Sequence, residues 1–379
     1  MRYLTHCLSF VFLFCFACEV APVQITTPDD TAAALEAEAN KLEAEFQAEL
    51  TERKKEVTSF PKRQAVSVPG GSVDALAAAI AQAGRGGTVV LESGVHTESA
   101  TVLIPHQLKL IGQAGAVLEV TTGLHNFATT SLDPAIHVLN APRTYITGIE
   151  IRPTGVAGGV GILVEDSPRT YLRENRIDQF QFGVLLEASD RVFIIGNEVI
   201  GTPLWQTNEA PFATGILTMK GDRAGVSGND VSGFFIGIWA CSRFGRVIGN
   251  EMQTNFLGLV LCRATPGTWK LPSGELSGSD FSAFRTLVFG NSAHDNLDVN
   301  IQAIDGANNN LLVFNSTDNA GRVDYEFTME TDRYSLGFLL PETFRNRALL
   351  PAGDTYVDCG TDNTIWGGEE VPADEVNCF

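Results

Sequence analysis

Positive charge is scarce in this chain. Its 379 residues include 26 Lys and Arg against 45 Asp and Glu, which gives a formal net charge of -19 and a sequence pI of about 4.7. A chain with that excess of acid repels nucleic acid and anionic membrane surfaces, so we expect neither as a partner. Binding of another polyanion would need a local basic patch or bound cations.

Several chemical signatures are also missing. The sequence contains no metal-binding motif, no glycine-rich phosphate loop and no nucleophile elbow. It therefore predicts no metal site and no nucleotide cofactor.

Long apolar runs are absent apart from Cys7 to Ala17. This run is too short to span a bilayer but has the size of a signal-peptide core, so residues 1–18 are predicted to be an export signal. Its end, Phe16-Ala17-Cys18, resembles a bacterial lipoprotein processing site, which implies lipidation of Cys18 as the mature N-terminus, although Cys15 departs from the usual pattern. Two locations stay open: a lipoprotein at the cell surface or outer membrane, held by the lipid alone, and a secreted or periplasmic protein.

The chain is rich instead in a repeat of 21 to 24 residues. Short aliphatic runs, most with a glycine at their second position, begin at Val160, Phe182, Thr214, Ile236, Leu257 and Val299, and a second column consists of Asn175, Asn197, Asn229, Asn250, Asn291 and Asn315. Short β-branched runs with glycine turns and no helical period predict a solenoid of parallel strands. The residues one and three places after each glycine should face its core.

These residues resemble the right-handed β-helix repeat of the pectate-lyase-like (pectin lyase fold) superfamily, over roughly residues 65–322. The resemblance implies an all-β fold, a single-stranded right-handed parallel β-helix, in which the alanine-rich segment 73–80 forms an N-terminal capping helix. It is uninformative about activity, because the scaffold hosts lyases, hydrolases, epimerases, binding modules and structural proteins.

Two flanking segments complete the predicted plan. Residues 19–64 are expected to be a tether containing a separate amphipathic helix over 31–57, and residues 323–379 a C-terminal cap or tail. The apolar stripe of the helix comprises Leu35, Leu42, Phe46, Leu50 and Val57. The helix is either a solvated spacer or docked on the solenoid or a partner helix, and we favour docking.

Four cysteines follow the signal. Their even number in an exported chain permits two disulfides. Cys359 with Cys378 would staple the tail. Cys241 and Cys262 occupy the same slot in successive coils, about 4.8 Å apart, which fits either a disulfide or stacked thiols.

An apolar column is predicted on the outer face of the solenoid: Leu163, Leu185, Leu217, Trp239, Val260 and Gln302. Such a stripe is typically covered or serves as an interaction surface. We favour covering by the N-terminal helix or by two insertions, 201–212 and 264–284, which contain Trp205 and Trp269. Alternatively, Trp205, Trp239 and Trp269 form a platform for sugar rings.

Charged residues also form columns. Arg169, Arg191, Arg223 and Arg285 stand six residues before the Asn column, with Arg143 in a similar place. This ladder could bind a uronate or sulfated polysaccharide, or be neutralised by Asp190 and Asp222, which is the interpretation we favour. Glu165 and Glu187 stack in neighbouring coils and fit a glycosidase pair, a calcium site or, preferably, surface charge.

The catalytic motifs of the superfamily were not found. The sequence therefore favours an exported protein that binds a glycan or another surface macromolecule through its outer face and insertion loops, with Trp205, Trp239, Trp269 and Arg169 as candidate contacts. The alternative is a lyase or hydrolase of acidic, uronate-containing polysaccharide, with calcium as its only expected cofactor. Its candidate catalytic residues are Glu165, Glu187, Arg191 and Arg223. A structural spacer or adhesin is a third possibility.

Overall fold

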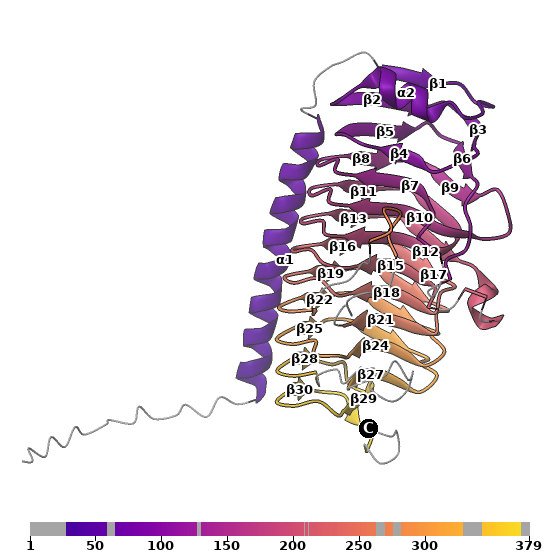
Figure 1. The fold of residues 1–379 in the computed structure, drawn as a ribbon. Coiled ribbons are helices and arrows are strands. Elements are labelled where there is room, and N and C mark those ends of the chain that lie inside the picture. Colours follow the sequence, from indigo (N-terminus) through magenta and orange to yellow (C-terminus); the bar gives the residue numbers. More distant parts are fainter. Residues whose placement is uncertain are drawn as a thin grey trace, which may run out of the picture.

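The computed structural model describes residues 28–58, 65–126, 130–207, 209–210, 212–262, 270–275, 282–328 and 343–372. In this part of the chain two sheets wind into one parallel β-helix (Figure 1). A long helix, α1 (Pro28–Thr58), lies along its side, and a short helix, α2 (Leu76–Ala83), covers its first coil. Neither helix is long and apolar enough to cross a membrane. The predicted signal with Cys18, and also Trp269 and Cys378, lie outside the described residues.

The first sheet has twelve parallel strands, one from each coil. In spatial order they are β1 (Ala65–Val68), β2 (Gly87–Leu91), β5 (Leu108–Gly112), β8 (Tyr145–Thr147), β11 (Tyr171–Arg173), β13 (Phe193–Ile195), β16 (Gly225–Ser227), β19 (Arg246–Ile248), β22 (Leu287–Phe289), β25 (Leu311–Val313), β28 (Arg347–Leu349) and β30 (Thr364–Trp366).

The second sheet has nineteen strands in two columns, which the long strand β12 (Arg176–Glu187) joins. One column holds β3 (Gly94–Glu98), β6 (Ala116–Val120), β9 (Glu150–Pro153), β14 (Glu198–Gly201), β17 (Asp230–Ser232), β20 (Glu251–Gln253), β23 (Ser292–His294) and β26 (Ser316–Asp318). The other holds β4 (Val102–Ile104), β7 (Pro134–Leu139), β10 (Gly158–Glu165), β15 (Thr214–Thr218), β18 (Ile236–Ala240), β21 (Leu257–Leu261), β24 (Val299–Ala303), β27 (Val323–Phe327), β29 (Thr355–Asp358) and β31 (Glu369–Glu370).

The predicted glycine column lines up along the solenoid. Gly161, Gly183, Gly215, Gly237 and Gly258 occupy one position of successive strands. A Cβ on Gly183 would lie 2.5 Å from the carbonyl oxygen of Gly215, and one on Gly215 would lie 2.6 Å from that of Gly237. Only glycine fits this approach between coils, which explains the repeat.

Two ladders fill the interior. The predicted aliphatic residues, such as Ile162, Val184 and Ile216, form one continuous core. Beside them, the side-chain amides of the Asn column form a chain of hydrogen bonds. The Asn175 side chain donates to Asn197 Oδ1 at 3.0 Å, and the Asn197 side chain donates to Asn229 Oδ1 at 3.0 Å. Because each buried amide is satisfied by the next coil, the column fixes the register at low energetic cost.

The apolar outer column is covered. Leu163 and Leu185 are fully buried and belong to a second apolar cluster, to which Leu271 of the second insertion and Leu132 contribute. The expected covering by an insertion is therefore confirmed for this part of the column. Helix α1 lies on a different face, against the twelve-stranded sheet.

Helix α1 docks along the solenoid, as its apolar stripe predicted. Leu35, Ala39, Phe46 and Leu50 are buried against aromatic and aliphatic residues of the twelve-stranded sheet. The helix runs opposite to the order of the coils, because Glu38 pairs with Arg347 of β28 whereas Val57 accepts a hydrogen bond from Lys109 of β5. Its 31 residues span about 46 Å, close to the roughly 43 Å from β5 to β30.

The solenoid continues past residue 322, where its sequence repeat fades. β27 pairs with β24 and β29, and β28 and β30 extend the other sheet. The glycine column no longer marks these coils. A different amide ladder, Asn310–Asn346–Asn363, links them instead. The boundary expected at 322 is therefore too early, and the cap expected over 323–379 consists in part of further coils.

Candidate functional site

One turn of every coil from β8 onward contains a residue in the left-handed conformation, two positions before a strand of the twelve-stranded sheet. These residues and their φ angles are Arg143 (62°), Arg169 (65°), Arg191 (54°), Arg223 (61°), Phe244 (55°), Arg285 (52°), Asn309 (53°), Arg345 (53°) and Asp362 (55°). Successive turns are joined by backbone hydrogen bonds, such as Arg191 N–H to Asp222 O at 2.8 Å. The side chains therefore stack at the strand spacing of about 4.8 Å, and we call them the turn column.

Arg169, Arg191 and Arg223 of the turn column do not form the ion pairs expected from the sequence, whereas Arg345 lies 3.9 Å from Asp362. Asp190 accepts a hydrogen bond from the backbone N–H of Asp222 at 2.8 Å, and Asp222 pairs with Arg243 at 2.8 Å. Among the described residues, no carboxylate lies within ion-pair distance of Arg169, Arg191 or Arg223. The two aspartates serve the turn and Arg243, so the preferred interpretation of a self-neutralised ladder is wrong for these arginines.

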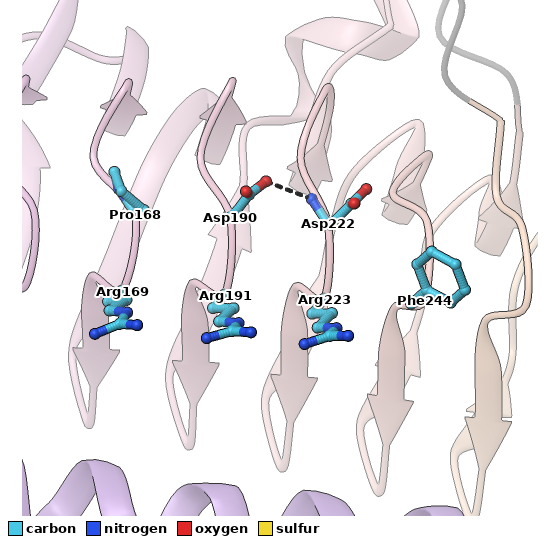
Figure 2. Close-up of a pocket in the computed structure, with 7 residues that line it drawn as sticks. All are labelled: Pro168, Arg169, Asp190, Arg191, Asp222, Arg223 and Phe244. Carbon is cyan, nitrogen blue, oxygen red and sulfur yellow. Dashed lines mark hydrogen bonds between the residues drawn. The ribbon is translucent and has the colours of Figure 1, made fainter.

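The unpaired guanidinium groups line a hollow of about 350 Å³ together with Pro168, Asp190, Asp222 and Phe244. Figure 2 shows Arg169, Arg191 and Arg223 in a row, their guanidinium groups on one side of the turns, with Phe244 next in the row. Asp190 and Asp222 project on the other side. Like charges on adjacent rungs repel one another, so an anion lying across them would be favoured.

Helix α1 forms a wall beside the turn column. A second hollow of about 640 Å³ lies among Glu38 and Leu42 of α1, Phe244, Arg285 and Arg345. A third, of about 310 Å³, lies among Glu45, Phe46 and Glu49 of α1, Arg223 and Phe244. Phe244 lines all three hollows, and we call the surface that they form together the arginine groove.

Two further arginines lie on the floor of the groove. Arg347 donates two hydrogen bonds of 2.8 Å to Glu38, which raises the pKa of the guanidinium and lowers that of the carboxyl. Arg246 donates only to the backbone oxygens of Phe244 and Gly245, at 3.1 and 3.0 Å. Burial lowers the pKa of Arg246, although Glu45 and Glu49 of α1 oppose the shift. Arg246 is thus a partly desolvated cation, and no carboxylate in the described part of the chain bonds to it directly.

The predicted catalytic carboxylates lie elsewhere. Glu165 and Glu187 are register partners on β10 and β12, as expected, but they are only 6% and 3% exposed. Glu165 Oε2 lies 2.9 Å from Nε2 of the buried His137. Neither glutamate lines the three hollows, so the described carboxylate pair and the turn-column arginines do not converge on one cavity.

The two described tryptophans of the predicted platform, Trp205 and Trp239, are not open to solvent as a platform. Trp205 is half-buried; its indole donates to the carbonyl of Gly233 at 3.0 Å, and its ring lies 6.0 Å from Phe235. Trp239 is half-buried beside the second apolar cluster. These two residues are packed against neighbouring side chains, so they do not form the sugar platform that was the alternative interpretation.

Cys241 and Cys262 form a disulfide with a Cα–Cα distance of 5.0 Å. Cys359 is also disulfide-bonded, and its expected partner Cys378 lies outside the described residues. No group of three or more His, Cys, Asp and Glu side chains within the described ranges is placed to hold a metal ion.

Comparisons with known proteins identify the fold. No protein-family model and no curated protein sequence matches this chain. Among solved structures, ORF18 of Geobacillus virus E2 is 12% identical and covers 85% of this chain, which spans 62% of the viral chain, with a TM-score of 0.51. The A-module of the mannuronan C-5 epimerase AlgE4 from Azotobacter vinelandii is 13% identical over 83% of this chain and 96% of its own, with a TM-score of 0.51.

This chain has the fold of a right-handed parallel β-helix. A third structure similar to this β-helix protein is PfbA, a surface adhesin of Streptococcus pneumoniae. It is 10% identical over 82% of this chain and 93% of its own, with a TM-score of 0.47.

Sequence reasoning missed Phe244, Arg246 and Arg347. Phe244 could have been found, because it stands six residues before Asn250, in the arginine slot of its coil. Arg246 and Arg347 carry no such signal: each begins a strand, and its place in the groove depends on where α1 docks.

Proposed function

We propose that this β-helix protein binds an acidic polysaccharide along the arginine groove. The observation that carries the proposal is the row of unpaired guanidinium groups at Arg169, Arg191 and Arg223, one on each successive rung. Guanidinium groups bind carboxylate and sulfate in a bidentate manner. A strand spacing of about 4.8 Å is also similar to the length of one sugar ring in an extended chain.

The location of the cations supports a specific ligand. In a chain of net charge -19, a general attraction to polyanions is opposed by the remaining surface. A polymer that lies along the row gains several charge-assisted contacts. A large anionic surface cannot reach the row without being repelled by the acidic residues around it. The mannuronan epimerase similar in fold is consistent with a polysaccharide ligand, and the predicted export signal would bring the protein to such polymers.

Binding is proposed rather than cleavage. The catalytic pair predicted from the sequence, Glu165 and Glu187, is buried, and Trp205 and Trp239, two of the three tryptophans expected to contact sugar, are packed. The proposed contact surface is therefore the turn column beside α1 rather than the apolar outer face and the insertion loops.

The test compares two arginine variants of the full chain. One, R169Q/R191Q/R223Q, removes the row; the other, R152Q/R176Q, removes two arginines of similar exposure from another face. Affinities for polygalacturonate, dextran sulfate and neutral dextran would be measured by titration calorimetry, with circular dichroism as the check on folding.

We expect the wild-type protein to bind the two acidic polymers and not dextran. Losing three charge-assisted contacts should weaken binding by at least about 100-fold, whereas R152Q/R176Q should bind like the wild type. Equal binding by the row variant, or no binding by the wild type, would contradict the proposal. Incubation of wild type with polygalacturonate, followed by assays for unsaturated products and reducing ends, would reveal any cleavage.

A further inference from the structure

The run of arginines in the turn column is first interrupted at Phe244, and Asn309 and Asp362 interrupt it again farther along. Arg143, Arg169, Arg191 and Arg223 occupy four successive coils, and the fifth coil presents Phe244 before the column returns to Arg285. The backbone is nearly the same at these positions, with φ of 61° at Arg223 and 55° at Phe244. The turn therefore does not require a different side chain at this coil.

Phe is an unfavourable choice for this backbone. Bulky side chains are rare at positive φ, whereas Asn adopts it readily and in fact occupies the same slot at Asn309 (φ 53°). Phe212 and Phe314 also have positive φ, at 54° and 57°, so the backbone conformation alone does not distinguish Phe244. What distinguishes it is that it lines all three hollows of the groove.

The ring of Phe244 is held in place and partly open to solvent. Phe284 of the next coil packs edge-on against it, with ring centroids 5.5 Å apart and an interplanar angle of 73°. The guanidinium of Arg285 lies 5.0 Å from the centroid of the Phe284 ring. Phe244 is half-buried and lines all three hollows of the groove, between Arg223 on one side and Arg285 on the other.

We propose that Phe244 is the residue that makes the arginine groove specific for sugar. An aromatic face packs against the C–H side of a pyranose ring, while acidic groups on the flanking units of the same polymer reach Arg223 and Arg285. The ligand class is thus an acidic glycan with one sugar ring over Phe244. A polyanion without sugar rings, such as polyphosphate, gains only the arginine contacts. This inference rests on the proposed function.

The test measures a ratio of affinities. Wild type, F244N and F244W would be titrated with polygalacturonate and with inorganic polyphosphate at one ionic strength. F244N suits the turn, as Asn309 shows, and removes the ring without changing the charge. We expect it to bind polygalacturonate about three- to tenfold more weakly, as for loss of one aromatic contact, and polyphosphate unchanged. F244W should retain the wild-type ratio.

The outcomes separate the two proposals. If wild type binds both polymers and F244N leaves their ratio unchanged, or lowers both affinities equally, Phe244 does not select sugar although the groove binds polyanions. If wild type binds neither polymer, the proposed function fails and this inference fails with it. F244R gives an independent measurement: it completes the arginine row, so it should strengthen polyphosphate binding and weaken the preference for glycan, and an unchanged preference would overturn the role of the ring.

Discussion

Two faces of the same solenoid use arginine in opposite ways. On the column of β9, β12 and β14, Arg152 bonds Glu119 at 2.6 Å and Glu150 at 3.1 Å, and Arg176 pairs with Glu198 of the neighbouring strand. In the turn column, Arg169, Arg191 and Arg223 lie in a row, and no described carboxylate is within ion-pair distance of them. On both faces, parallel strands bring residues of adjacent coils close together. Ion pairs between neighbouring coils are therefore geometrically possible on either face.

The difference shows which cations are satisfied within the protein. Where Arg on one rung faces Glu on the next, as Arg176 faces Glu198, the cation has a partner within the protein and needs no ligand. Where three rungs repeat Arg, each charge raises the energy of its neighbours. The carboxylates that line the same hollows, Asp190, Asp222, Glu45 and Glu49, form no ion pair with these three arginines, so solvent, salt or a bound anion can compensate further. The comparison therefore separates structural arginines from the candidate binding residues.

The largest effect is expected from weakening the contact between the solenoid and α1, the helix that lies beside the turn column and not beside the face of Arg152 and Arg176. Phe46 of α1 packs on Phe193 at a centroid distance of 6.0 Å and fits above Gly225, where a Cβ would lie 2.6 Å from the Phe46 ring. F46A should weaken the docking of α1 by about 3 kcal/mol, the usual loss for a buried Phe. Hydrogen exchange of the α1 amides should accelerate while that of β17 and β20 stays unchanged; equal protection of α1 in both proteins would argue against this contact.

The next largest effect, on ligand binding, is expected from placing a Glu among the row arginines, as on the face of Arg152 and Arg176, which we call the paired face. R191E places a carboxylate between Arg169 and Arg223, about 4.8 Å from each rung. Polygalacturonate binding should fall by about 100-fold, because one contact is lost and two are neutralised. The midpoint of urea unfolding should rise slightly. R176E is the control, and it should leave binding intact while lowering the midpoint.

A smaller effect distinguishes the two kinds of arginine by stability alone. R176Q removes a paired cation and should lower the free energy of unfolding by up to about 1 kcal/mol, the range of exposed ion pairs. R191Q removes a repelled cation and should leave the free energy unchanged or raise it. Urea titration of both variants measures the difference, and an equal loss in the two would mean that Arg191 has a structural partner.

The smallest effect is a pH dependence confined to the paired face. His294 of β23 lies 2.9 Å from Asp295 and 3.3 Å from Glu251, with Asp318 as its register partner, and the hydrogen bond to Asp295 chiefly raises its pKa. A raised folded-state pKa stabilises the fold fully below the unfolded value, near about 6.5, and that contribution disappears as pH rises through the folded-state pKa.

The measurement is the unfolding free energy between about pH 5 and pH 9. Wild type should lose a few tenths of a kcal/mol with rising pH, because the site is screened by solvent, and H294Q should lose less. Binding in the arginine groove should not follow this titration, since guanidinium stays charged throughout.

The sequence predicted the solenoid because the features that define it are periodic. Gly183 and Asn197 each meet their counterparts in the next coil, so close approach and amide pairing impose one residue type at one spacing. The arginine row was visible for the same reason. Whether these arginines have ion-pair partners was not visible in the sequence. The carboxylate of Asp190 can turn toward a guanidinium or toward a backbone N–H, and both arrangements have the same residue spacing.

The sequence repeat could not predict features that depend on contacts between segments far apart in the chain. The wall of the groove requires Glu38 to meet Arg347, more than 300 residues later in the chain, and no local pattern encodes that meeting. Burial of Glu165 and Glu187 likewise depends on what covers the strands rather than on the strands themselves.

The direction of α1 has a consequence for the order of assembly. The ribosome makes this helix before any coil, yet its first turns meet β28, which is among the last strands to be synthesised. The helix can begin to dock at its far end, near Lys109, as soon as the early coils exist. Docking of the helix can be completed only when nearly all coils have folded, so full docking of α1 follows the folding of the whole solenoid.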